Sequence, residues 1–453
     1  MSPASLAGRV LITASAIALV ALRPPPTVAG ELENPLGTAS KIRDPRNRIG
    51  SSEAAPAQAM TAGDLPGSWK LPGTDTSVAL HGYVKADAIY TLGAPHSVVG
   101  DSFAVSMIPL DGSRAENQGD DVRFHARQSR VRIDTSTPTE HGALKTRIET
   151  DFFGAAGEQG FANGDGMRIR HAWASIGPLL AGQTFSTFED QDTIPDAIDF
   201  FGPIGAKQVF QGQLRYTAQL GGTLSLDAAV ENPEQSNVTS GGTSNVGVVD
   251  RHPDYAAALR YRDSWGAAHL AAVLRNFSYD DGRGAADRTW GYGVRLGGHA
   301  KLDGKDRLGF TLKLGDGLGR YLRGAAAEVA VRCAQALPQG AAAFAPGCGA
   351  ELETQFAWGG WVGGTHYWTD QLRSSAYYGH LRNSLARDSL GPAAAGLIET
   401  LDTMHVNLIW SPVPAVSFGT EFMQGWRRNA SGPQAAADRG KAQRVQIGMQ
   451  ANF

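Results

Sequence analysis

The sequence predicts an all-β fold, a transmembrane antiparallel β-barrel of about 16 strands, and three observations support this class. Segments in which apolar and polar residues alternate follow one another through most of the chain, as in strands with one apolar and one polar face. The connections between them are alternately short and long, as in barrels with tight turns at one end and loops at the other. The last alternating segment also ends on an aromatic residue, Phe453.

The composition of the 453 residues agrees with this class and excludes others. Only 19% of the residues are charged, against about 25% in typical soluble domains. Beyond the N-terminus no run approaches the roughly 20 consecutive apolar residues of a membrane-spanning helix. The formal net charge of −3, from 41 basic and 44 acidic residues, shows no basic excess. Because nucleic-acid binding needs such an excess, no nucleic-acid partner is expected.

The first 29 residues predict a secretory signal peptide. A weakly positive start with Arg9 precedes an apolar run over 10–22, which is too short to span a bilayer. Small residues at 27–29 place the cleavage site after Ala29; the alternative interpretation of the run is a buried apolar helix. Residues 30–76 are rich in Pro, Gly, Ala and Ser, and the prolines forbid a continuous helix. We therefore expect a disordered periplasmic extension over 30–76 and the barrel over 77–453.

Alternating segments from residue 77 onward give sixteen expected strands. They cover 78–90, 122–137, 143–153, 168–177, 179–186, 208–218, 222–231, 254–263, 265–277, 289–300, 306–316, 353–369, 371–382, 402–411, 415–427 and 442–453. The connections after even-numbered strands are short. Those after odd-numbered strands are long: 91–121, 154–167, 187–207, 232–253, 278–288, 317–352, 383–401 and 428–441. Short periplasmic turns and long external loops are typical of outer-membrane barrels.

The strand faces predict which side chains point into the barrel. In 144–152 one face carries Leu, Thr, Ile and Phe, whereas the other carries Lys145, Arg147, Glu149 and Asp151. A charged face opposite an apolar face fits a wall between lipid and water. Aromatic residues near the strand ends are expected to form an interfacial girdle. They are Tyr90, Trp265, Trp290, Tyr321, Trp368, Trp410 and Trp426.

Basic residues gather on the second to sixth expected strands and form a candidate pore-lining set. By parity, the set comprises Arg130, Arg132, Lys145, Arg147, Arg168, Arg170 and Arg215. Because adjacent strands lie about 4.8 Å apart, these side chains would form one patch. Guanidinium groups bind carboxylates and phosphates, and rings of Arg or Lys select anions in pores. The alternative is that the arginines pair with Asp134, Glu149 and Asp151 and only brace the wall.

The loop 187–207 after the fifth strand is acidic, with Glu189, Asp190, Asp192, Asp196 and Asp199. A loop at this place can fold into the barrel and set its constriction. Acidic side chains opposite a basic wall would then create a transverse field across the lumen. The alternative is a solvated external loop.

The two cysteines, Cys333 and Cys348, lie in the expected loop 317–352. Two are too few for a disulfide scaffold or a zinc site built on cysteines. On the oxidising cell-surface side we expect a disulfide between them that staples the loop. The histidines are scattered without metal-ligand spacing, so no metal site and no cofactor are predicted.

Several motifs between about residues 80 and 235 resemble, in order, the DcaP-like family of bacterial outer-membrane porins. They are RQSRV (127–131), GALK (142–145), IETDF (148–152), RIRHAW (168–173), LAGQTFSTF (180–188), IPDAIDF (194–200), LRY (214–216) and ENPE (231–234). The C-terminal half is similar mainly in its barrel pattern. The resemblance implies a sixteen-stranded, homotrimeric channel in the outer-membrane lipid that takes up small organic anions such as dicarboxylates. It also makes the matched arginines candidates for a selective wall.

The chain departs from that family at two places. Family members often carry a periplasmic coiled coil before the barrel, which the Pro-rich segment 30–76 cannot form. Before the sixth strand the family tends to have Arg-Gln, where this chain has Lys207-Gln208. The second departure bears on which solute would be taken up.

The function that the sequence favours is diffusive uptake of small hydrophilic solutes by an outer-membrane porin, with anions preferred. No Gly-x-Ser-x-Gly, His-Glu-x-x-His or P-loop motif is present, so we do not expect an enzyme. The alternatives are a surface adhesin or structural barrel without transport, and an outer-membrane hydrolase whose catalytic set is assembled by the fold.

Overall fold

Sixteen long strands account for most of the described structure. The computed structural model describes residues 61–155, 164–206, 208–234, 238–240, 243–244, 248–280, 282, 284, 286–322, 324, 328–333, 350–385, 396–430 and 437–453. Helical segments there are short: α2 (His96–Val99) and the 3-10 turns Val105–Met107, Glu116–Gln118 and Gly319–Tyr321. No helix in these residues has both the length and the apolar character needed to cross a membrane.

The strands lie close to the ranges that alternation predicts. They are β2 (Ser77–Leu92), β3 (Asp121–His125), β4 (Arg130–Thr137), β5 (Leu144–Asp151), β6 (Arg168–Ile176), β7 (Leu179–Phe185), β8 (Phe210–Gln219), β9 (Leu224–Glu231), β12 (Asp254–Asp263), β13 (Gly266–Asp280), β14 (Ala286–Lys301), β15 (Arg307–Asp316), β18 (Phe356–Tyr367), β19 (Leu372–Ser384), β20 (Ile398–Val413), β21 (Val416–Asn429) and β22 (Arg439–Asn452). With β3 and β4 taken as one interrupted strand, these make sixteen in the described chain.

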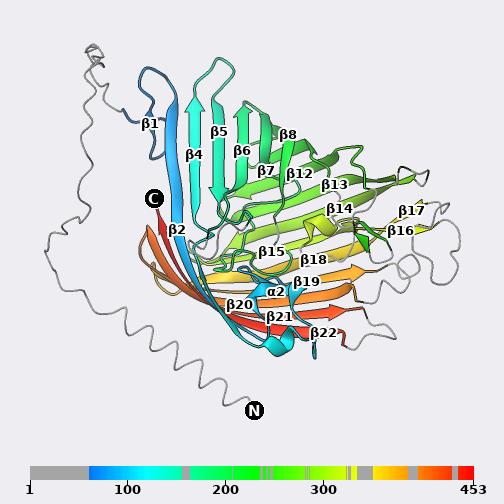
Figure 1. Cartoon of the computed structure of the whole chain (residues 1–453). Coiled ribbons are helices and arrows are strands. Elements are labelled where there is room, and N and C mark those ends of the chain that lie inside the picture. Colours follow the sequence, from blue (N-terminus) through cyan, green and yellow to red (C-terminus); the bar gives the residue numbers. More distant parts are fainter. Residues whose placement is uncertain are drawn as a thin grey trace, which may run out of the picture. The chain divides into compact units, whose positions relative to one another are not determined.

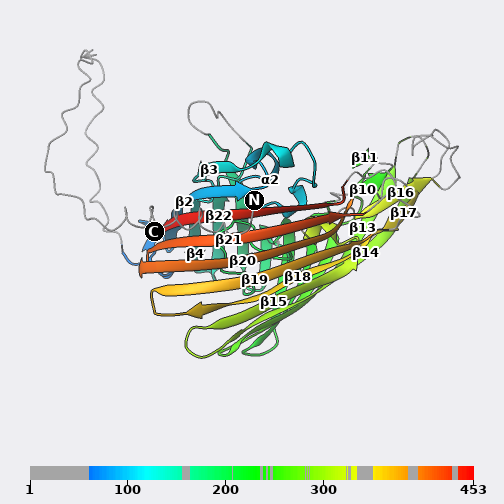
Figure 2. The same cartoon turned by 90° about the horizontal axis from the view of Figure 1, so that it is seen from below.

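The sheet closes on itself because β2 pairs on both edges. One edge pairs antiparallel with β22, from Tyr83↔Asn452 to Leu92↔Gln443. The other edge pairs with β3 and then with β4. Strands β4–β8 cross the direction of β13–β22 on the other side (Figure 1), as tilted strands of a barrel do, and β18–β22 lie side by side in the view from below (Figure 2). The predicted antiparallel barrel is therefore confirmed.

The expected strand 122–137 is interrupted over 126–129. There the chain turns, with the Ser129 N–H donating to the Ala126 carbonyl at 3.0 Å. The Ser129 hydroxyl accepts from the Lys85 N–H at 3.0 Å and so replaces a main-chain partner of β2. Because the strand is interrupted here, the Arg127 side chain contacts two neighbouring loops. Its guanidinium donates to the Asp101 carboxylate at 2.6 Å and to the Phe152 carbonyl at 3.3 Å.

The two faces of the wall differ in polarity, as the alternation predicts. Outward side chains such as Val84, Phe124 and Ile148 are 58%, 72% and 55% exposed. Six of the predicted girdle aromatics are also exposed: Tyr90, Trp265, Trp290, Trp368, Trp410 and Trp426. Tyr321 is different. It is completely buried, its ring packs on Phe188, and the Gln211 side chain donates to its hydroxyl, because the turn Gly319–Tyr321 folds into the barrel interior.

The connections alternate in length with one exception. Turns such as 177–178 and 264–265 join strands at one end, whereas the other end carries loops such as 93–120 and 186–209. The expected loop 278–288 shrinks to 281–285, because β13 and β14 continue pairing out to Asp280↔Ala286. Short strands also occur among the long loops: β10 (Val238–Ser240), β11 (Thr243–Ser244), β16 (Val329–Cys333) and β17 (Ala350–Thr354) form a separate four-stranded sheet.

The described chain begins before the expected barrel boundary at residue 77. The strand β1 (Trp69–Lys70) pairs with Ser77 and Val78 of β2, and the Ser77 hydroxyl bonds Asp64 at 3.1 Å. Residues 61–76 are thus hydrogen-bonded onto the barrel and belong to the compact unit Gln58–Phe453. The predicted signal peptide and residues 30–60 of the predicted extension lie outside the described residues.

Candidate functional site

The loop between β7 and β8, residues 186–209, lies against the inner face of the barrel. The Ile198 N–H donates to a carboxylate oxygen of Glu421 on β21 at 2.6 Å, and the Ile198 carbonyl accepts from Lys85 Nζ at 2.6 Å. The Ile204 N–H donates to the Thr403 hydroxyl on β20 at 2.9 Å. These partners are buried residues on the inward faces of their strands, so the loop enters the barrel interior.

Glycines let the loop backbone approach the wall closely. Gly205 has φ +89°, a conformation that favours glycine, and a Cβ there would lie 2.4 Å from the backbone carbon of Gly360 on β18. Likewise, a Cβ on Gly379 of β19 would lie 2.3 Å from the Ile204 carbonyl oxygen. The backbone of residues 204–205 therefore packs directly on the backbone of β18 and β19.

All five acidic residues predicted for this loop are paired with basic residues of β12–β22. The pairs are Glu189–Lys313 at 2.8 Å, Asp190–Arg260 at 3.3 Å, Asp192–Arg262, Asp196–Arg373 at 2.6 Å, and Asp199–Arg444 at 3.9 Å. Glu189, Asp190 and Asp199 are buried, at 2–3% exposed. The carboxylates anchor the loop to one wall, and their charges are matched by that wall.

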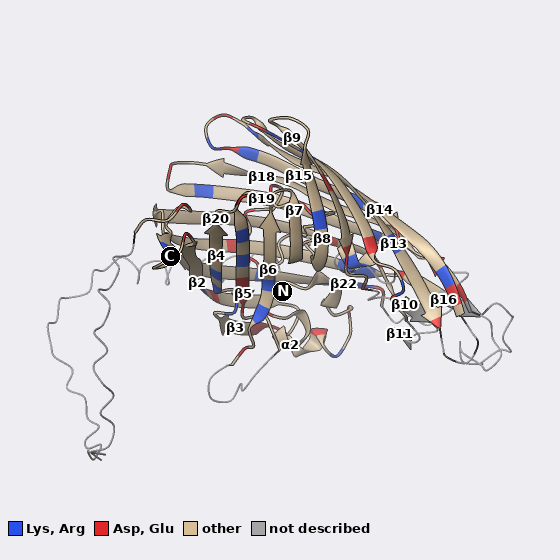
Figure 3. Ribbon diagram, turned by 90° about the horizontal axis from the view of Figure 1, so that it is seen from above, with Lys and Arg blue, Asp and Glu red and all other residues tan. Residues whose placement is uncertain are grey.

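The candidate pore-lining residues lie on the opposite part of the barrel. The inward faces of β4, β5 and β6 carry Arg130, Arg132, Lys145, Arg147, Arg168 and Arg170, together with Asp134, Glu149 and Asp151. Six basic and three acidic side chains give this surface, which we call the basic wall, a net charge of 6 − 3 = +3. Figure 3 shows its charged residues as neighbouring bands on β4, β5 and β6.

Each carboxylate of the basic wall is shared by two arginines. Asp134 bonds Arg147 at 2.7 Å and Arg132 at 2.9 Å. The remaining pairs are Glu149 with Arg170 at 2.9 Å and with Arg130 at 3.4 Å, and Asp151 with Arg168 at 2.7 Å and with Arg170 at 3.0 Å. The arginines thus form the wall-bracing pairs of the alternative interpretation, and the basic side chains of the wall exceed its carboxylates in number.

Two candidate residues have no acidic partner. Within the described residues the Lys145 ammonium forms no ion pair, and Lys145 is exposed. The Arg215 Nε has no hydrogen-bond partner, because the nearby Asp227 bonds Arg260 at 2.6 Å and Thr217 at 2.6 Å. Lys145 is exposed, whereas the Arg215 Nε is buried.

The loop meets the basic wall through an aromatic contact. The Phe200 ring stacks on Phe153, with centroids 4.3 Å apart. The guanidinium carbons of Arg168 and Arg170 lie 5.5 and 5.6 Å from the Phe200 centroid. The loop is therefore anchored by carboxylates on one side and touches arginines and an aromatic ring on the other.

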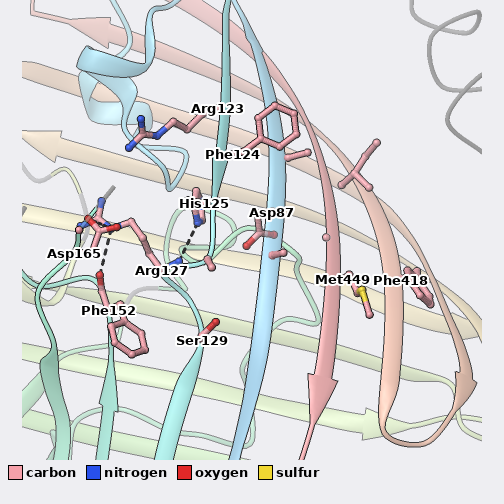
Figure 4. Close-up of a pocket in the computed structure, with 16 residues that line it drawn as sticks. Asp87, Arg123, Phe124, His125, Arg127, Ser129, Phe152, Asp165, Phe418 and Met449 are labelled. Atoms are coloured by element: carbon pink, nitrogen blue, oxygen red, sulfur yellow. Dashed lines mark hydrogen bonds and ion pairs between the residues drawn. The ribbon is translucent and has the colours of Figure 1, made fainter. Parts of the chain in front are cut away.

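A cavity of about 780 Å³ lies where β3 gives way to β4. Figure 4 shows its charged side, with Arg127 between His125, Phe152 and Asp165, and its apolar side, with Phe124, Phe418 and Met449. Phe124 and Met449 are outward residues, whereas Asp87 and His125 belong to the inward faces of their strands, so the cavity extends from the outer surface into the wall. Arg127 is held by Asp101, Asp165 and two carbonyls and is a structural tie between loops.

Sequence reasoning did not single out the basic residues that hold the loop. Arg260, Lys313, Arg373 and Arg444 each occupy an inward position among small or polar neighbours. The alternation of inward and outward residues along each strand could have assigned them to the barrel interior. It could not have identified their carboxylate partners, because those depend on the path of the loop. The expected disulfide falls on Cys348, outside the described residues, and on the side chain of Cys333, which is likewise not described. Lys207 also lies outside the described residues.

Known proteins match this chain at the levels of family and fold. Residues 66–336 match the family model described as DcaP outer membrane protein. The crystal structure of the outer membrane channel DcaP of Acinetobacter baumannii superposes with a TM-score of 0.69 at 24% identity, covering 85% of this chain and 99% of that one. An anion-selective porin from Comamonas acidovorans superposes with a TM-score of 0.52 at 13% identity, over 83% of this chain and all of that one. Porin Omp2b of Brucella canis is 27% identical over 224 residues, 46% of this chain. The chain spans about half the length, 53%, of this curated relative.

Proposed function

Because the chain belongs to the DcaP outer membrane protein family, we propose that it forms a channel for the diffusion of small hydrophilic solutes, with anions preferred. It is a protein of the cell outer membrane, and its relatives are porins and channels. Its own inward side chains determine the electrostatic character of the passage.

The basic wall carries this proposal. Its net charge of +3 lies on the inward faces of three adjacent strands, β4, β5 and β6. Arginine-lined surfaces in a narrow pore attract anions and repel cations, because the surrounding low-dielectric protein focuses their field. Lys145 at one end and the partly exposed Arg168 at the other mark a line of cations along the strands.

The loop 186–209 supports the same preference in an indirect way. It narrows the passage, so solutes must come close to the basic wall. Its five carboxylates are paired with basic residues of β12–β22 and so oppose the field of the basic wall only weakly. Phe200 then presents an apolar ring beside Arg168 and Arg170.

We further propose small dicarboxylates as the favoured solutes. Guanidinium groups bind carboxylates with two parallel hydrogen bonds. The wall offers several arginines at strand spacing, about 4.8 Å apart, so two carboxylates of one small solute can be bound together. The Phe200 ring beside the arginines would favour solutes that combine carboxylates with an apolar body.

A homotrimer is part of this proposal. The outward cavity beside β2 has the small residues Ala86 and Ala88 at its base, with Phe124 and Met449 at its rim. An apolar hollow of this kind can receive side chains of a second copy within the membrane. Sedimentation of the detergent-solubilised protein measures the assembly; a monomer at micromolar concentration would contradict this part and leave the channel untouched.

Conductance across planar bilayers tests the channel. We expect discrete steps, a reversal potential of the sign given by anion flow under a KCl gradient, and a decrease in chloride current when succinate or phthalate is added. Correctly folded protein that gives no conductance would refute the channel and favour a structural or adhesive barrel. A cation-selective reversal potential would refute only the anion preference, and we expect no hydrolase activity toward outer-membrane lipids or esters.

A further inference from the structure

The outward surface of β18–β22 changes from apolar to basic toward the long-loop end of the barrel. Strand register places Trp358, Arg382, Thr400, Arg428 and Arg439 in one row across five neighbouring strands. The next row toward the other end is Gly360, His380, Asp402, Trp426 and Lys441. We call Arg382, Arg428, Arg439 and Lys441 the outer basic rim.

Two further rows complete the gradient of polarity. The third row holds Val362, Tyr378, Met404, Gln424 and Gln443, and the fourth holds Gly364, Ala376, Val406, Phe422 and Val445. Side chains of the fourth row such as Val406 and Phe422 are 45% and 37% exposed on the lipid-facing surface. Within a few residues along the strands, the surface thus passes from hydrocarbon-compatible to cationic.

The four basic side chains of the rim are exposed, and two of them have no partner. Within the described residues, neither the Arg382 guanidinium nor the Lys441 ammonium forms a hydrogen bond or ion pair. The Arg428 guanidinium lies 3.6 Å from the Glu399 carboxylate, and the Arg439 guanidinium lies 3.8 Å from that of its chain neighbour Asp438. Both contacts are long, and the side chains of Arg428 and Arg439 are 49% and 72% exposed.

Asp402, the third carboxylate near the rim after Glu399 and Asp438, does not form an ion pair with the rim. Asp402 accepts hydrogen bonds from the Tyr378 hydroxyl and, at 2.7 Å, from the His380 ring. The Trp358 indole borders the rim in the first row, and the Trp426 indole lies within it, beside Lys441 in the second row. Tryptophan is enriched where the hydrocarbon of a membrane meets its headgroups, so these rows lie at headgroup level.

We propose that the outer basic rim binds the phosphate groups of phosphorylated glycolipids in the outer leaflet of the membrane. The long loops place this end of the strands at the cell surface. Arg382 and Arg428 are two strands apart, about 10 Å, and Arg439 adjoins Arg428, so their guanidinium groups can bind more than one phosphate of a single headgroup. The acyl chains of that lipid lie along the apolar fourth row.

The position of the rim favours a lipid over a soluble anion. It faces away from the barrel interior, so it takes no part in the passage of solutes. A basic side chain beside an anionic membrane surface typically strengthens binding about fivefold, and clusters of basic residues are recognised by their additive effect. The two indole rings and the adjacent apolar rows match a ligand that has both a phosphate headgroup and hydrocarbon chains.

Native mass spectrometry of the detergent-solubilised full chain, titrated with bisphosphorylated lipid A, tests the proposal. The test variant is Arg382→Gln/Arg428→Gln/Lys441→Gln, in which all three changes are at exposed positions. The matched control is Arg288→Gln, an exposed outward arginine beside Trp290 on β14 that has no basic neighbours in its row. Conductance of each variant shows that the barrel is folded.

We expect the triple variant to bind lipid A at least about tenfold more weakly, since three basic side chains are removed. Arg288→Gln should bind like the unmodified protein, and lipid A without phosphates should bind the unmodified protein as weakly as the triple variant binds intact lipid A. Unchanged binding in the triple variant overturns the proposal. So does an equal loss in Arg288→Gln, or complete displacement of the lipid by millimolar inorganic phosphate.

Discussion

Replacing Arg130 and Arg147 by alanine should reduce the anion preference of the channel while leaving its fold intact. The two arginines share their carboxylates with other residues: Glu149 keeps Arg170 at 2.9 Å, and Asp134 keeps Arg132 at 2.9 Å. No carboxylate of the basic wall is therefore left without a partner. The net charge of the wall falls from +3 to 3 − 2 = +1.

The size of the effect can be worked out from simple electrostatics. A unit charge about 8 Å from an ion in water contributes roughly 0.5 kcal/mol before screening. At 0.15 M salt the Debye length is also about 8 Å, which reduces this energy to roughly 0.2 kcal/mol. Anions and cations feel opposite signs, so each removed charge changes the anion-to-cation permeability ratio about twofold, and the pair about fourfold. At 0.01 M salt, where screening is weak, each charge changes the ratio about fourfold.

Reversal potentials under a KCl gradient measure this ratio directly. The control is Arg288→Ala, which removes a basic residue from the outside of the barrel and should leave the reversal potential unchanged. We expect the reversal potential of the double variant to lie closer to zero than that of the unmodified protein, with a larger difference at low salt. A reversal potential equal to that of the unmodified protein at both salt concentrations would refute the argument that the basic wall sets selectivity.

Three further predictions concern the loops. Lys313→Met should lower the free energy of unfolding by about 3–5 kcal/mol in chemical denaturation, because the buried Glu189 carboxylate loses its 2.8 Å partner and keeps only a long 3.8 Å contact with Arg295, and adding Glu189→Gln should restore most of the loss. Gly205→Ala should give a larger, noisier single-channel current, because the new Cβ would lie 2.4 Å from the Gly360 backbone, whereas Gly212→Ala, with open space at its Cβ, should not. Burial raises the pKa of Asp101 in loop 93–120, but the hydrogen bond from Arg127 and the charges of His125 and His96 outweigh it and hold that pKa below its usual 3.8. This carboxylate therefore stabilises the loop above about pH 4, and the stabilisation is lost as the pH falls through the lowered pKa. The protection factors of residues 93–120 against hydrogen exchange, which are corrected for the slower intrinsic exchange in acid, should fall as the pH is lowered, and Asp101→Asn should remove that pH dependence.

Strand positions were the most predictable part of this fold, and the physical reason is the membrane. Lipid on one side and water on the other force an alternation that continues through Leu144–Asp151, where Lys, Arg, Glu and Asp occupy one face. The interruption at 126–129 was not predictable, because it depends on the Ser129 hydroxyl bonding Lys85 N–H, a residue 44 positions earlier. Local alternation carries no information about such a contact.

Side-chain partners were less predictable than side-chain faces. Parity places Arg147 in the interior, but the choice of Asp134 as its partner depends on the register of β4 with β5. Tyr321 shows the same limit, since an aromatic residue after a strand can enter the interface or, as here, fold back into the barrel. The acidic loop could be located from its sequence, whereas the five basic residues that hold it come from strands β12 to β22 and meet it only in the folded chain.

These pairings change how the charge of the loop acts on the lumen. Free carboxylates facing the basic wall would create a transverse field across the lumen. Their negative charge would also cancel part of the attraction of the basic wall for an anion. Here the five carboxylates form ion pairs with basic residues of the opposite wall, so these pairs contribute five acidic and five basic charges at short separation. Close opposite charges produce a field that decays faster with distance than that of a net charge. The excess of +3 on β4, β5 and β6 then acts on passing ions with little opposition, and the loop affects selectivity mainly by bringing solutes near that wall.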